Sequence, residues 1–374
     1  MDIYARVKYN KPEELFNSTE YQENIKTLGN PVFSRDFFTK GAFEPMNISE
    51  FAGYAGVSKS AVSRYFNNGY LSDDKREKIE KAIEETGYSP SFSAQTIKTR
   101  VTKLVGVIIP KLSSESCARI TEGISQVLYS CGYQILLANT ANDYNKEMEY
   151  LDLFRQNRVD GVIFLATVFT DVHRSLMNKM HIPVVVVGQQ YKGYSCVCHD
   201  DYGAAYALTE LMLNKGAKRP AYIGVTDEDK AAGEARHNGF LKALSDHNIR
   251  LEKQYSDIAE FNVDSGYTCA KKILLGNELP DCIFCATDNI AAGAMLFCRE
   301  HGIKIPDDVM ICGVGDSKIG AITAVPLTSA RLHYKTAGIE AAQMLLNSIG
   351  RSSNVPKIMK LDYEIVERES TNRV

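Results

Sequence analysis

Polar and basic side chains gather at the start of a short helix-like pattern between residues 58 and 67. Lysine and arginine suit the acceptor atoms of guanine in the major groove, and serine can bond a phosphate or a base. Alanine is small enough to permit a close approach to DNA. The residues of these types are Lys59, Ser60, Ala61, Ser63 and Arg64. A solvated basic face on a small helical bundle has the same pattern, so DNA contact here is a hypothesis.

The nine cysteines suggest a second chemistry, metal binding, through two close pairs. Cys196 and Cys198 are two apart in a strand-like run, so they share a face and could reach one metal. Cys282 and Cys285 are three apart in a strand-like run and face opposite ways, whereas zinc ligands at this spacing suit a turn. We therefore favour buried, reduced thiols that pack as small hydrophobic groups.

The basic stretch belongs to a group of three helices that the sequence predicts over residues 47–90. Asn47 and Glu50 have the spacing of a capping box at the start of the first helix. Gly56 supplies a tight turn before the second helix, and Gly87 ends the third. Two short helices joined by a glycine-containing turn are typical of the helix-turn-helix, whose second helix presents its N-terminal residues to the major groove.

From residue 103 onward, apolar strand-like runs alternate with amphipathic helical patterns. This alternation predicts an α/β protein with parallel sheets that helices cover on both faces. The number of units predicts two doubly wound lobes with a ligand crevice outside the carboxyl ends of the strands. The clearest strand-like runs are residues 103–110, 133–139, 160–166, 183–188, 220–225, 282–287 and 309–315.

Length and composition indicate a globular protein of two or three domains. The chain has 374 residues, of which 44% are hydrophobic and 24% are charged, with a formal net charge of -3. This balance excludes a basic nucleic-acid coat, although a local binding face remains compatible with it. No apolar run approaches the ~20 residues of a membrane span, and the first residues lack the apolar core of a secretory signal. We expect a cytoplasmic protein that does not bind membranes.

The first 45 residues differ from the rest of the chain. They are rich in aromatic residues but lack a steady hydrophobic period. We expect an upstream extension, possessing little structure of its own, with Met46 as the biological start. A small extra element that packs on a neighbour is the alternative.

Several motifs match a known family at fixed spacings. They are Ala55-Gly56-Val57-Ser58, Val62-Ser63-Arg64, Asn67 and Gly87-Tyr88-Ser89-Pro90. The sequence resembles the lactose/galactose-repressor (LacI/GalR) family of bacterial transcription regulators from about Met46 to the C-terminus. The resemblance implies a helix-turn-helix headpiece over 46–90, a hinge over 91–103 and a two-lobed, periplasmic-binding-protein-like domain over 104–374 that binds an effector and dimerises.

The resemblance also implies DNA contacts in the hinge, which in the family folds on the operator and wedges a leucine into the minor groove. Ala94 matches the family pattern, and Ile97 stands where the leucine usually stands. Lys98 and Arg100 add charge for phosphates. Without the resemblance, an ordinary flexible linker is the simpler interpretation.

In the large domain, the resemblance places hydroxyl-binding groups near the ends of strands. These are Gln189, Asp201, Arg236, Thr287, Asp288 and Asp316. The family often has two successive aspartates after its late strand; Gly315 replaces the first of them and Asp316 matches the second, which weakens any assignment of a specific monosaccharide. Several stretches look most like trehalose-operon repressors, with sucrose-type repressors as neighbours. Lys111, with Ser116 nearby, stands where the trehalose type has a basic residue for a phosphate, and a solvated lysine is the alternative.

The leading interpretation is a homodimeric, sugar-responsive repressor of a carbohydrate-utilisation operon. It would bind double-stranded operator DNA and a sugar or sugar-phosphate effector, with no further cofactor, no metal and no catalysis. A sugar-binding protein without a DNA-regulatory role is an alternative. A doubly wound enzyme is less favoured, because its best feature, GVGDSKIG at 313–320, has Lys318 where a dinucleotide motif needs its third glycine.

Overall fold

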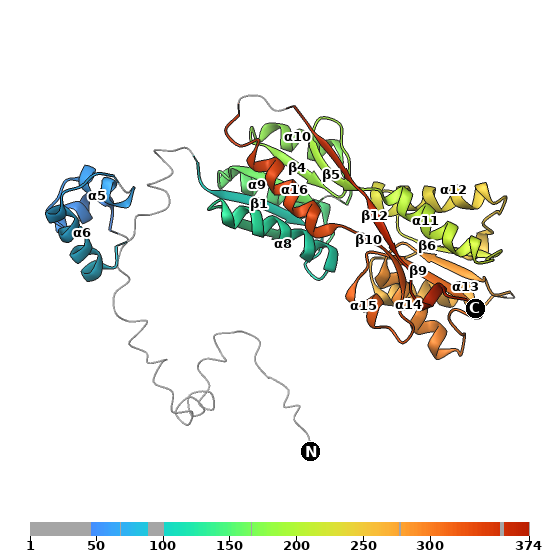
Figure 1. Cartoon of the computed structure of the whole chain (residues 1–374). Helices are drawn as coiled ribbons and strands as arrows, with labels where there is room; N and C mark the ends of the chain where they lie inside the picture. The colour runs from blue at the N-terminus through green and yellow to red at the C-terminus, as the bar shows by residue number, and fades with distance from the viewer. Residues whose placement is uncertain are drawn as a thin grey trace, which may run out of the picture. The chain divides into compact units, whose positions relative to one another are not determined.

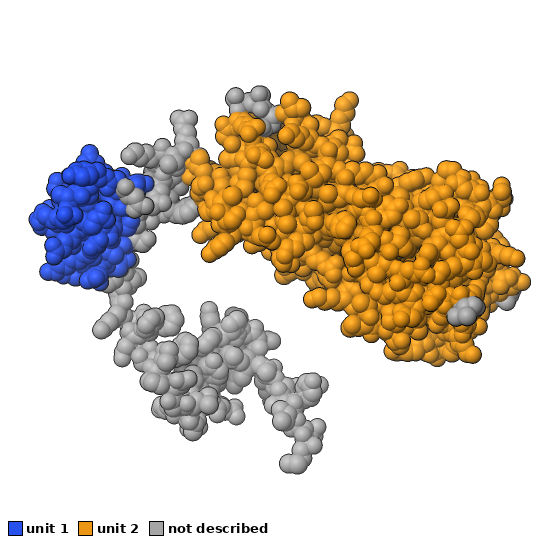
Figure 2. All heavy atoms as spheres, in the orientation of Figure 1, with its two compact units in different colours: residues 1–99 blue, residues 100–374 orange. Residues whose placement is uncertain are grey.

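The computed structural model describes residues 46–67, 69–88, 101–165, 167–276, 278–351 and 355–373. These residues belong to two compact units, which fall within residues 1–99 and 100–374 (Figure 2). The expected extension over residues 1–45 lies outside the described residues. The same is true of four residues expected to contact DNA, Ala94, Ile97, Lys98 and Arg100.

The first unit contains the predicted helices α4 (Ile48–Tyr54), α5 (Lys59–Phe66) and α6 (Asp73–Thr86). The predicted capping box is present, because Asn47 Oδ1 accepts from the backbone N–H of Glu50 at 3.1 Å and the Asn47 N–H donates to Glu50 Oε2 at 2.9 Å. The glycine between α4 and α5, Gly56, has a φ of +63°, which favours glycine. Phe51 is fully buried and stacks on Tyr88 with a centroid separation of 3.9 Å.

The N-terminal lobe of the second unit is built on a parallel sheet with the strand order β11-β5-β4-β3-β1-β2 (Figure 1). Its strands are β1 (Leu104–Ile109), β2 (Gln134–Asn139), β3 (Gly161–Leu165), β4 (Val184–Val187), β5 (Ser195–His199) and β11 (Ile358–Leu361). Its helices are α8 (Glu115–Ser130), α9 (Tyr144–Gln156), α10 (Asp171–Lys179) and α16 (Tyr334–Leu346). Helices α8 and α16 pack on one face and α9 and α10 on the other, as the hydrophobic clusters show.

The C-terminal lobe has the strand order β12-β10-β9-β8-β6-β7, with β12 antiparallel to β10 and the other pairs parallel. Its strands are β6 (Pro220–Gly224), β7 (Ser256–Ile258), β8 (Cys282–Cys285), β9 (Met310–Val314), β10 (Thr328–Leu332) and β12 (Tyr363–Val366). Helices α11 (Asp201–Asn214) and α12 (Arg236–Asp246) cover one face, and α13 (Val263–Leu274) and α14 (Asp288–Glu300) cover the other. The short elements are α15 (Lys318–Ile322), the π-helix η1 (Lys230–Ala235) and the 3₁₀ helices η2 (Lys253–Tyr255) and η3 (Glu369–Thr371).

The described chain passes between the lobes at three places, after β5, after β10 and after β11. Figure 1 shows the C-terminal segment, in red, running from one lobe into the other. Two of these crossings are bonded to each other, because the Asp200 N–H donates to Leu361 O at 2.9 Å and Lys360 Nζ lies 2.6 Å from Asp200 Oδ1. The lobes are therefore joined by three chain crossings, and connecting segments of this kind are where domains hinge around a ligand.

Glycines allow the helices on one face of the N-terminal lobe to approach closely. A Cβ atom at Gly123 of α8 would lie 2.2 Å from Lys335 O, and one at Gly338 of α16 would lie 2.0 Å from Ile120 O. Both obstructing atoms belong to the backbone, so they cannot move aside as a flexible side chain could. Helices α8 and α16 consequently pack backbone to backbone along this contact.

The cysteines agree with the interpretation of buried thiols. All nine lie in the described part of the chain and are free, and all but Cys131 are buried. Burial raises the pKa of the Cys282 thiol and that of the Cys285 thiol well above the usual value for cysteine. No group of three or more His, Cys, Asp or Glu residues in the described ranges is placed to hold a metal ion. Within the same ranges, no helix is long and apolar enough to cross a membrane.

Candidate functional site

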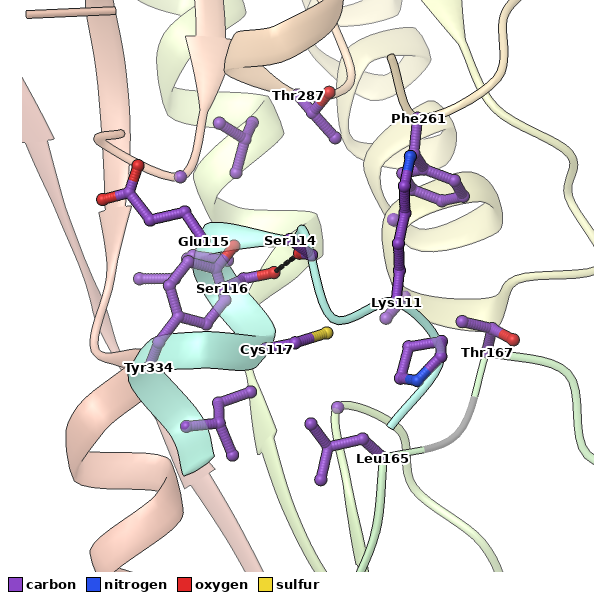
Figure 3. Close-up of a pocket in the computed structure, with 18 of the residues that line it drawn as sticks. Lys111, Ser114, Glu115, Ser116, Cys117, Leu165, Thr167, Phe261, Thr287 and Tyr334 are labelled. Atoms are coloured by element: carbon purple, nitrogen blue, oxygen red, sulfur yellow. Dashed lines mark hydrogen bonds between the residues drawn. The ribbon is translucent and has the colours of Figure 1, made fainter. Parts of the chain in front are cut away.

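A cavity opens between the two lobes of the second unit, at the carboxyl ends of the strands in both sheets. Its lining includes residues that follow β1, β3 and β4 in one lobe and β6, β8 and β9 in the other. The predicted position of the crevice is therefore correct. The cavity encloses about 220 Å³, which suits a small molecule and not a macromolecule. Figure 3 shows part of this lining.

Asp201 and Arg236 form a buried ion pair in the cavity wall. Each is the first residue of a helix, α11 or α12, and they are 4% and 5% exposed. Arg236 Nε donates to Asp201 Oδ1 at 2.8 Å, and Nη2 of Arg236 lies 2.7 Å from the same oxygen. Burial disfavours the guanidinium charge, but the attraction of Asp201 outweighs it and holds the pKa of Arg236 above its usual range. The pair is therefore a fixed, charged group at the cavity.

Thr287 and Asp288 follow β8 and also line the cavity. Thr287 caps α14, accepting from the Ile290 N–H at 3.4 Å. Asp288 accepts from the Ser317 N–H and from the Ser329 hydroxyl, each at 2.6 Å. Burial raises the pKa of the Asp288 carboxyl. These bonds show that Asp288 holds the loop after β9 in addition to facing the cavity.

Gln189 connects the two lobes across the cavity. Its Nε2 donates to Asp229 Oδ1 of the C-terminal lobe at 3.0 Å and also to Thr167 O. Asp229 caps the π-helix η1 by accepting from the N–H groups of Ala231 and Ala232, each at 2.9 Å. Burial raises the pKa of Asp229. The Gln189–Asp229 bond therefore links the end of β4 to the segment that leads into Arg236.

Lys111 lies in the segment that leads into α8, and Ser116 is in the first turn of that helix. Both line the cavity, and Ser116 Oγ lies 2.8 Å from Ser114 Oγ. Figure 3 shows Lys111 extending beside Phe261, on the opposite side of the cavity from Tyr334. The carboxylate of Glu115 pairs with Arg119, whose Nη2 lies 2.7 Å away, and accepts a hydrogen bond from the Lys318 N–H at 3.0 Å, so it does not pair with Lys111. The other two lysine or arginine residues of the lining, Arg119 and Arg236, are paired with carboxylates, so we take the Lys111 end as the cationic end of the cavity.

Asp316 departs from the expectation. It is not among the described residues that line the cavity, although its neighbours Gly315 and Ser317 are. Its carboxylate accepts from Arg331 Nε at 2.7 Å and from Arg368 Nη2 at 2.5 Å. Burial opposes ionisation, but these hydrogen bonds outweigh it and lower the pKa of Asp316. The structure therefore gives this carboxylate a role in holding the C-terminal lobe together instead of a ligand contact.

The cavity residues that sequence reasoning missed include His199, Asp229, Phe261 and Tyr334. Each lies at or soon after the end of a strand, β5, β6, β7 or β10. The rule that ligands bind at the carboxyl ends of parallel strands could have found His199 and Asp229, which border runs already expected to be strands. Tyr334 and Phe261 follow β10 and β7, whose sequences gave no strand signal.

The helix α5 presents part of the predicted DNA-contact set to solvent. Lys59, Ser60 and Arg64 are exposed, and Ser63 is half-buried. Ala61 is only 4% exposed, so the expectation that it approaches DNA is wrong. It occupies the inward side of the helix, next to the fully buried Val62. The side chain of Ser58, the N-cap residue, accepts from the Ala61 N–H at 3.2 Å and fixes the start of the helix.

Comparison with known proteins identifies the family. Residues 47–91 match the family described as bacterial regulatory proteins, lacI family, and residues 209–371 match the periplasmic binding protein-like domain. The sucrose operon repressor of Staphylococcus xylosus is 32% identical over 299 residues, which cover 80% of this chain and 92% of that protein. The chain belongs to the LacI family of bacterial regulatory proteins.

Other LacI-family proteins match over nearly their whole length. The HTH-type transcriptional regulator RegA of Clostridium saccharobutylicum is 30% identical, with 87% of this chain and 99% of that protein covered. A solved complex of the regulator CelR with cellobiose is 25% identical, covers 87% of this chain and 99% of its own, and has a TM-score of 0.67. The lac repressor dimer bound to operator and an anti-inducer has a TM-score of 0.79 at 21% identity, over 88% and 99% of the two chains, and shows the fold. The predicted family and fold class are confirmed.

Proposed function

We propose that this LacI-family regulator represses a carbohydrate-utilisation operon and that a sugar or sugar phosphate in the cavity changes its affinity for operator DNA. The observation that carries this proposal is the combination of two sites in one chain. Helix α5 presents Lys59, Ser60 and Arg64 to solvent, and a separate unit holds a small-molecule cavity between two lobes.

The proposal assigns four segments to four roles. Residues 46–90 are the DNA-binding headpiece, and residues 91–103 are the hinge, with Ala94, Ile97, Lys98 and Arg100 meeting DNA. Residues 104–374 bind the effector and dimerise, and residues 1–45 are an extension. The family match over residues 47–91 and the division of the chain near residue 100 support the first two boundaries.

A polyhydroxylated effector fits the chemistry of the cavity wall. Sugar hydroxyls both donate and accept hydrogen bonds, and the wall supplies charged and amide groups of both kinds. Those in the proposed set are Gln189, Asp201, Arg236, Thr287 and Asp288. Phe261 and Tyr334 add aromatic surface, which suits the apolar face of a sugar ring. The relatives whose names refer to sucrose and cellobiose support the same ligand class.

A phosphate on the effector would fit at the Lys111 end. The first turn of an α-helix offers backbone N–H groups without intrahelical partners, and its dipole favours an anion. Ser116 is in the first turn of α8, which begins at Glu115, and Lys111 lies in the segment that leads into this helix. At this end, an ammonium group and a hydroxyl would add to the helix N-terminus in binding a phosphate.

The chain is proposed to act as a homodimer. Strand β2 forms an edge of the N-terminal sheet, and its Leu136 and Leu137 are 37% and 42% exposed. Successive residues of a strand point to opposite faces, so both sides of this edge are apolar. Exposed apolar edge strands are typical sites of contact with another chain. Two copies would supply two headpieces, which predicts a near-palindromic operator.

A binding assay with both ligands tests the function. Fluorescence anisotropy would measure affinity for a duplex recovered from a random-sequence pool, with sucrose, trehalose, cellobiose or trehalose 6-phosphate added. We expect tight, salt-sensitive DNA binding that at least one sugar shifts by roughly tenfold or more. If a sugar binds without changing operator affinity, or if no duplex is recovered at low ionic strength, the proposed function is wrong.

A further inference from the structure

His199 is a buried polar residue with an unused hydrogen-bonding atom beside the cavity. It is the last residue of β5, it lines the cavity, and it is 7% exposed. Its Nε2 atom is buried and has no hydrogen-bond partner among the described residues. A buried polar atom without a partner costs free energy, so native proteins rarely keep one without a reason.

The surroundings of His199 define what its Nε2 can do. The ring packs edge to face against Tyr334, with centroids 5.2 Å apart, and it has a hydrogen bond with the backbone of His333. Burial lowers the pKa of His199, Arg236 and the side chain of His333 lower it further, and Asp201 opposes them. The ring is therefore neutral near pH 7. A neutral ring that donates one N–H to the backbone keeps a lone pair on the other nitrogen.

The groups next to His199 are already committed to one another. Asp201 and Arg236 are ion-paired within the protein, and Arg236 Nη1 also donates to Ala286 O. In contrast to these paired groups, Nε2 of His199 is one of the buried side-chain atoms without a hydrogen-bond partner in the described part of the chain. Because His199 is among the residues that line the cavity, a ligand held there is the partner that this atom lacks within the protein.

We propose that Nε2 of His199 accepts a hydrogen bond from a hydroxyl of the effector and so determines which sugars bind. This inference rests on the proposed function and adds the orientation of the ligand. The ring of His199 is neutral and the Asp201–Arg236 pair has no net charge, so the part of the effector that lies against them is uncharged and hydroxylated. Any anionic group lies at the Lys111 end of the cavity. A sugar whose hydroxyl at this position is methylated or missing is rejected.

Two substitutions separate the hydrogen bond from packing. His199→Phe keeps a flat ring but removes both the acceptor Nε2 and the N–H that bonds the backbone of His333, whereas His199→Gln places an amide near the position of Nε2. Isothermal titration of the full chain with sucrose, trehalose, cellobiose and trehalose 6-phosphate measures the effect. For each sugar that the unsubstituted chain binds, we expect His199→Phe to weaken binding roughly 5- to 50-fold and His199→Gln to recover most of the loss. His247→Gln, a change away from the cavity, serves as the control.

A spectroscopic readout distinguishes a ligand contact from a structural role. In the full chain with ¹⁵N-labelled histidine, the His199 Nε2 signal, assigned by its absence from His199→Gln, is expected to shift when the bound sugar is added. The melting temperature of the sugar-free chain is expected to fall by roughly 2–4 °C in His199→Phe, because the hydrogen bond to the backbone of His333 is lost together with the unpartnered nitrogen.

The outcomes separate this inference from the proposed function. If the unsubstituted chain binds a sugar and His199→Phe binds it equally well, or the Nε2 signal does not move, the role of His199 is wrong while the function stands. If the unsubstituted chain binds none of the four sugars, both the sugar-responsive function and the role of His199 are overturned.

Discussion

Three buried carboxylates among the described residues line the cavity, and each is held by different donors. Asp201 accepts from a guanidinium, Asp229 from two backbone N–H groups and an amide, and Asp288 from a backbone N–H and a hydroxyl. The donors fix the orientation of each carboxylate before a ligand arrives. Preorganisation of this kind lowers the entropy that is lost on binding and favours selectivity among similar hydroxylated ligands.

The pairing of Asp316 with Arg331 and Arg368 predicts a pH-dependent contribution to stability. A carboxyl whose pKa is lower in the folded state stabilises the fold above its unfolded pKa, ordinarily 3.8, and loses this effect as pH falls through the folded pKa. We expect Asp316→Asn to reduce the free energy of unfolding by about 1–3 kcal/mol at neutral pH. Urea unfolding should show this difference shrinking as the pH falls below 3.8.

The exposed Asp307 supplies a control for this measurement, because Asp307→Asn removes a carboxylate without breaking a described ion pair of its side chain. A difference between Asp316→Asn and the unsubstituted chain that persists unchanged under acid conditions would contradict the electrostatic explanation and point to packing.

Sequence motifs could indicate which residues approach the cavity but not how they are partnered. Gln189, Asp201, Arg236, Thr287 and Asp288 all line it, because motif position fixes a residue relative to the end of its strand. Asp316 is one residue from the lining, and the two arginines that engage it come from β10 and from a segment after β12. Such long-range pairing leaves no local signal. The burial of Ala61 shows the same limit on the headpiece.

At the scale of the element, helix α5 predicts a graded loss of DNA binding. Arg64 is exposed on α5, where it can reach a base edge or a phosphate. We expect Arg64→Ala to weaken binding to the selected duplex by roughly 10- to 100-fold. Anisotropy titrations at several salt concentrations would also show a shallower salt dependence if the arginine contacts a phosphate.

Helix α6 provides the matched control. Lys78 is exposed there and pairs with Asp74 at 3.1 Å, so Lys78→Ala removes one positive charge from the same unit away from α5. Equal losses for Arg64→Ala and Lys78→Ala would show that binding depends on net charge alone and would contradict recognition through α5.

The crossing of α8 and α16 predicts a large effect from a single methyl group. Gly338→Ala would place its Cβ 2.0 Å from Ile120 O, so the helices must separate. We expect a loss of about 1–3 kcal/mol in the free energy of unfolding, measured with urea. Gly276→Ala is the control, because its Cβ would meet Ile273 O at an ordinary 3.4 Å. Equal stability of the two variants would mean that the helix contact tolerates separation.

The strands of the second unit differ in how clearly the sequence predicts them. Central strands such as β3 and β8 are buried along their full length and read as continuous apolar runs. Strand β10, with the sequence TSARL, is also buried, but its buried Thr328 and Ser329 have side-chain hydroxyls that bond to other segments. Because β10 is polar in composition, an apolar run does not reveal it as a strand. Its hydroxyls can be buried only because residues distant in the sequence supply their hydrogen-bond partners.

At the scale of the whole molecule, the apolar edge at β2 predicts the effect of a surface charge on assembly. Leu136→Glu would place a carboxylate where the second copy is proposed to pack. We expect the dissociation constant of the dimer to rise by roughly tenfold or more in sedimentation equilibrium. Leu275→Glu, at a leucine that is 60% exposed after α13, should leave the dimer intact. A dimer equally stable in both variants would exclude β2 from the interface.

The cavity lies where a ligand can influence the angle between the lobes. Its polar groups come from both lobes, and Gln189 already bonds Asp229 across it. A second set of contacts joins α8 to the loop after β9, where Arg119 Nη2 donates to Asp316 O at 3.2 Å. A ligand that bonds both walls binds one lobe arrangement more tightly than another, and this difference in affinity is what shifts the population of states.

Thermodynamic linkage gives a quantitative relation between sugar binding and operator binding. If a sugar changes operator affinity by some factor, the operator must change sugar affinity by the same factor, for which values of roughly 5- to 150-fold are typical. Sugar titrations of the full chain, alone and saturated with the selected duplex, measure one factor, and duplex titrations with and without sugar measure the other. Arg64→Ala supplies the control, because at a duplex concentration too low to saturate this weaker-binding variant its sugar affinity should be nearly the same with and without duplex. A sugar affinity that the saturating duplex leaves unchanged would contradict coupling between the two sites.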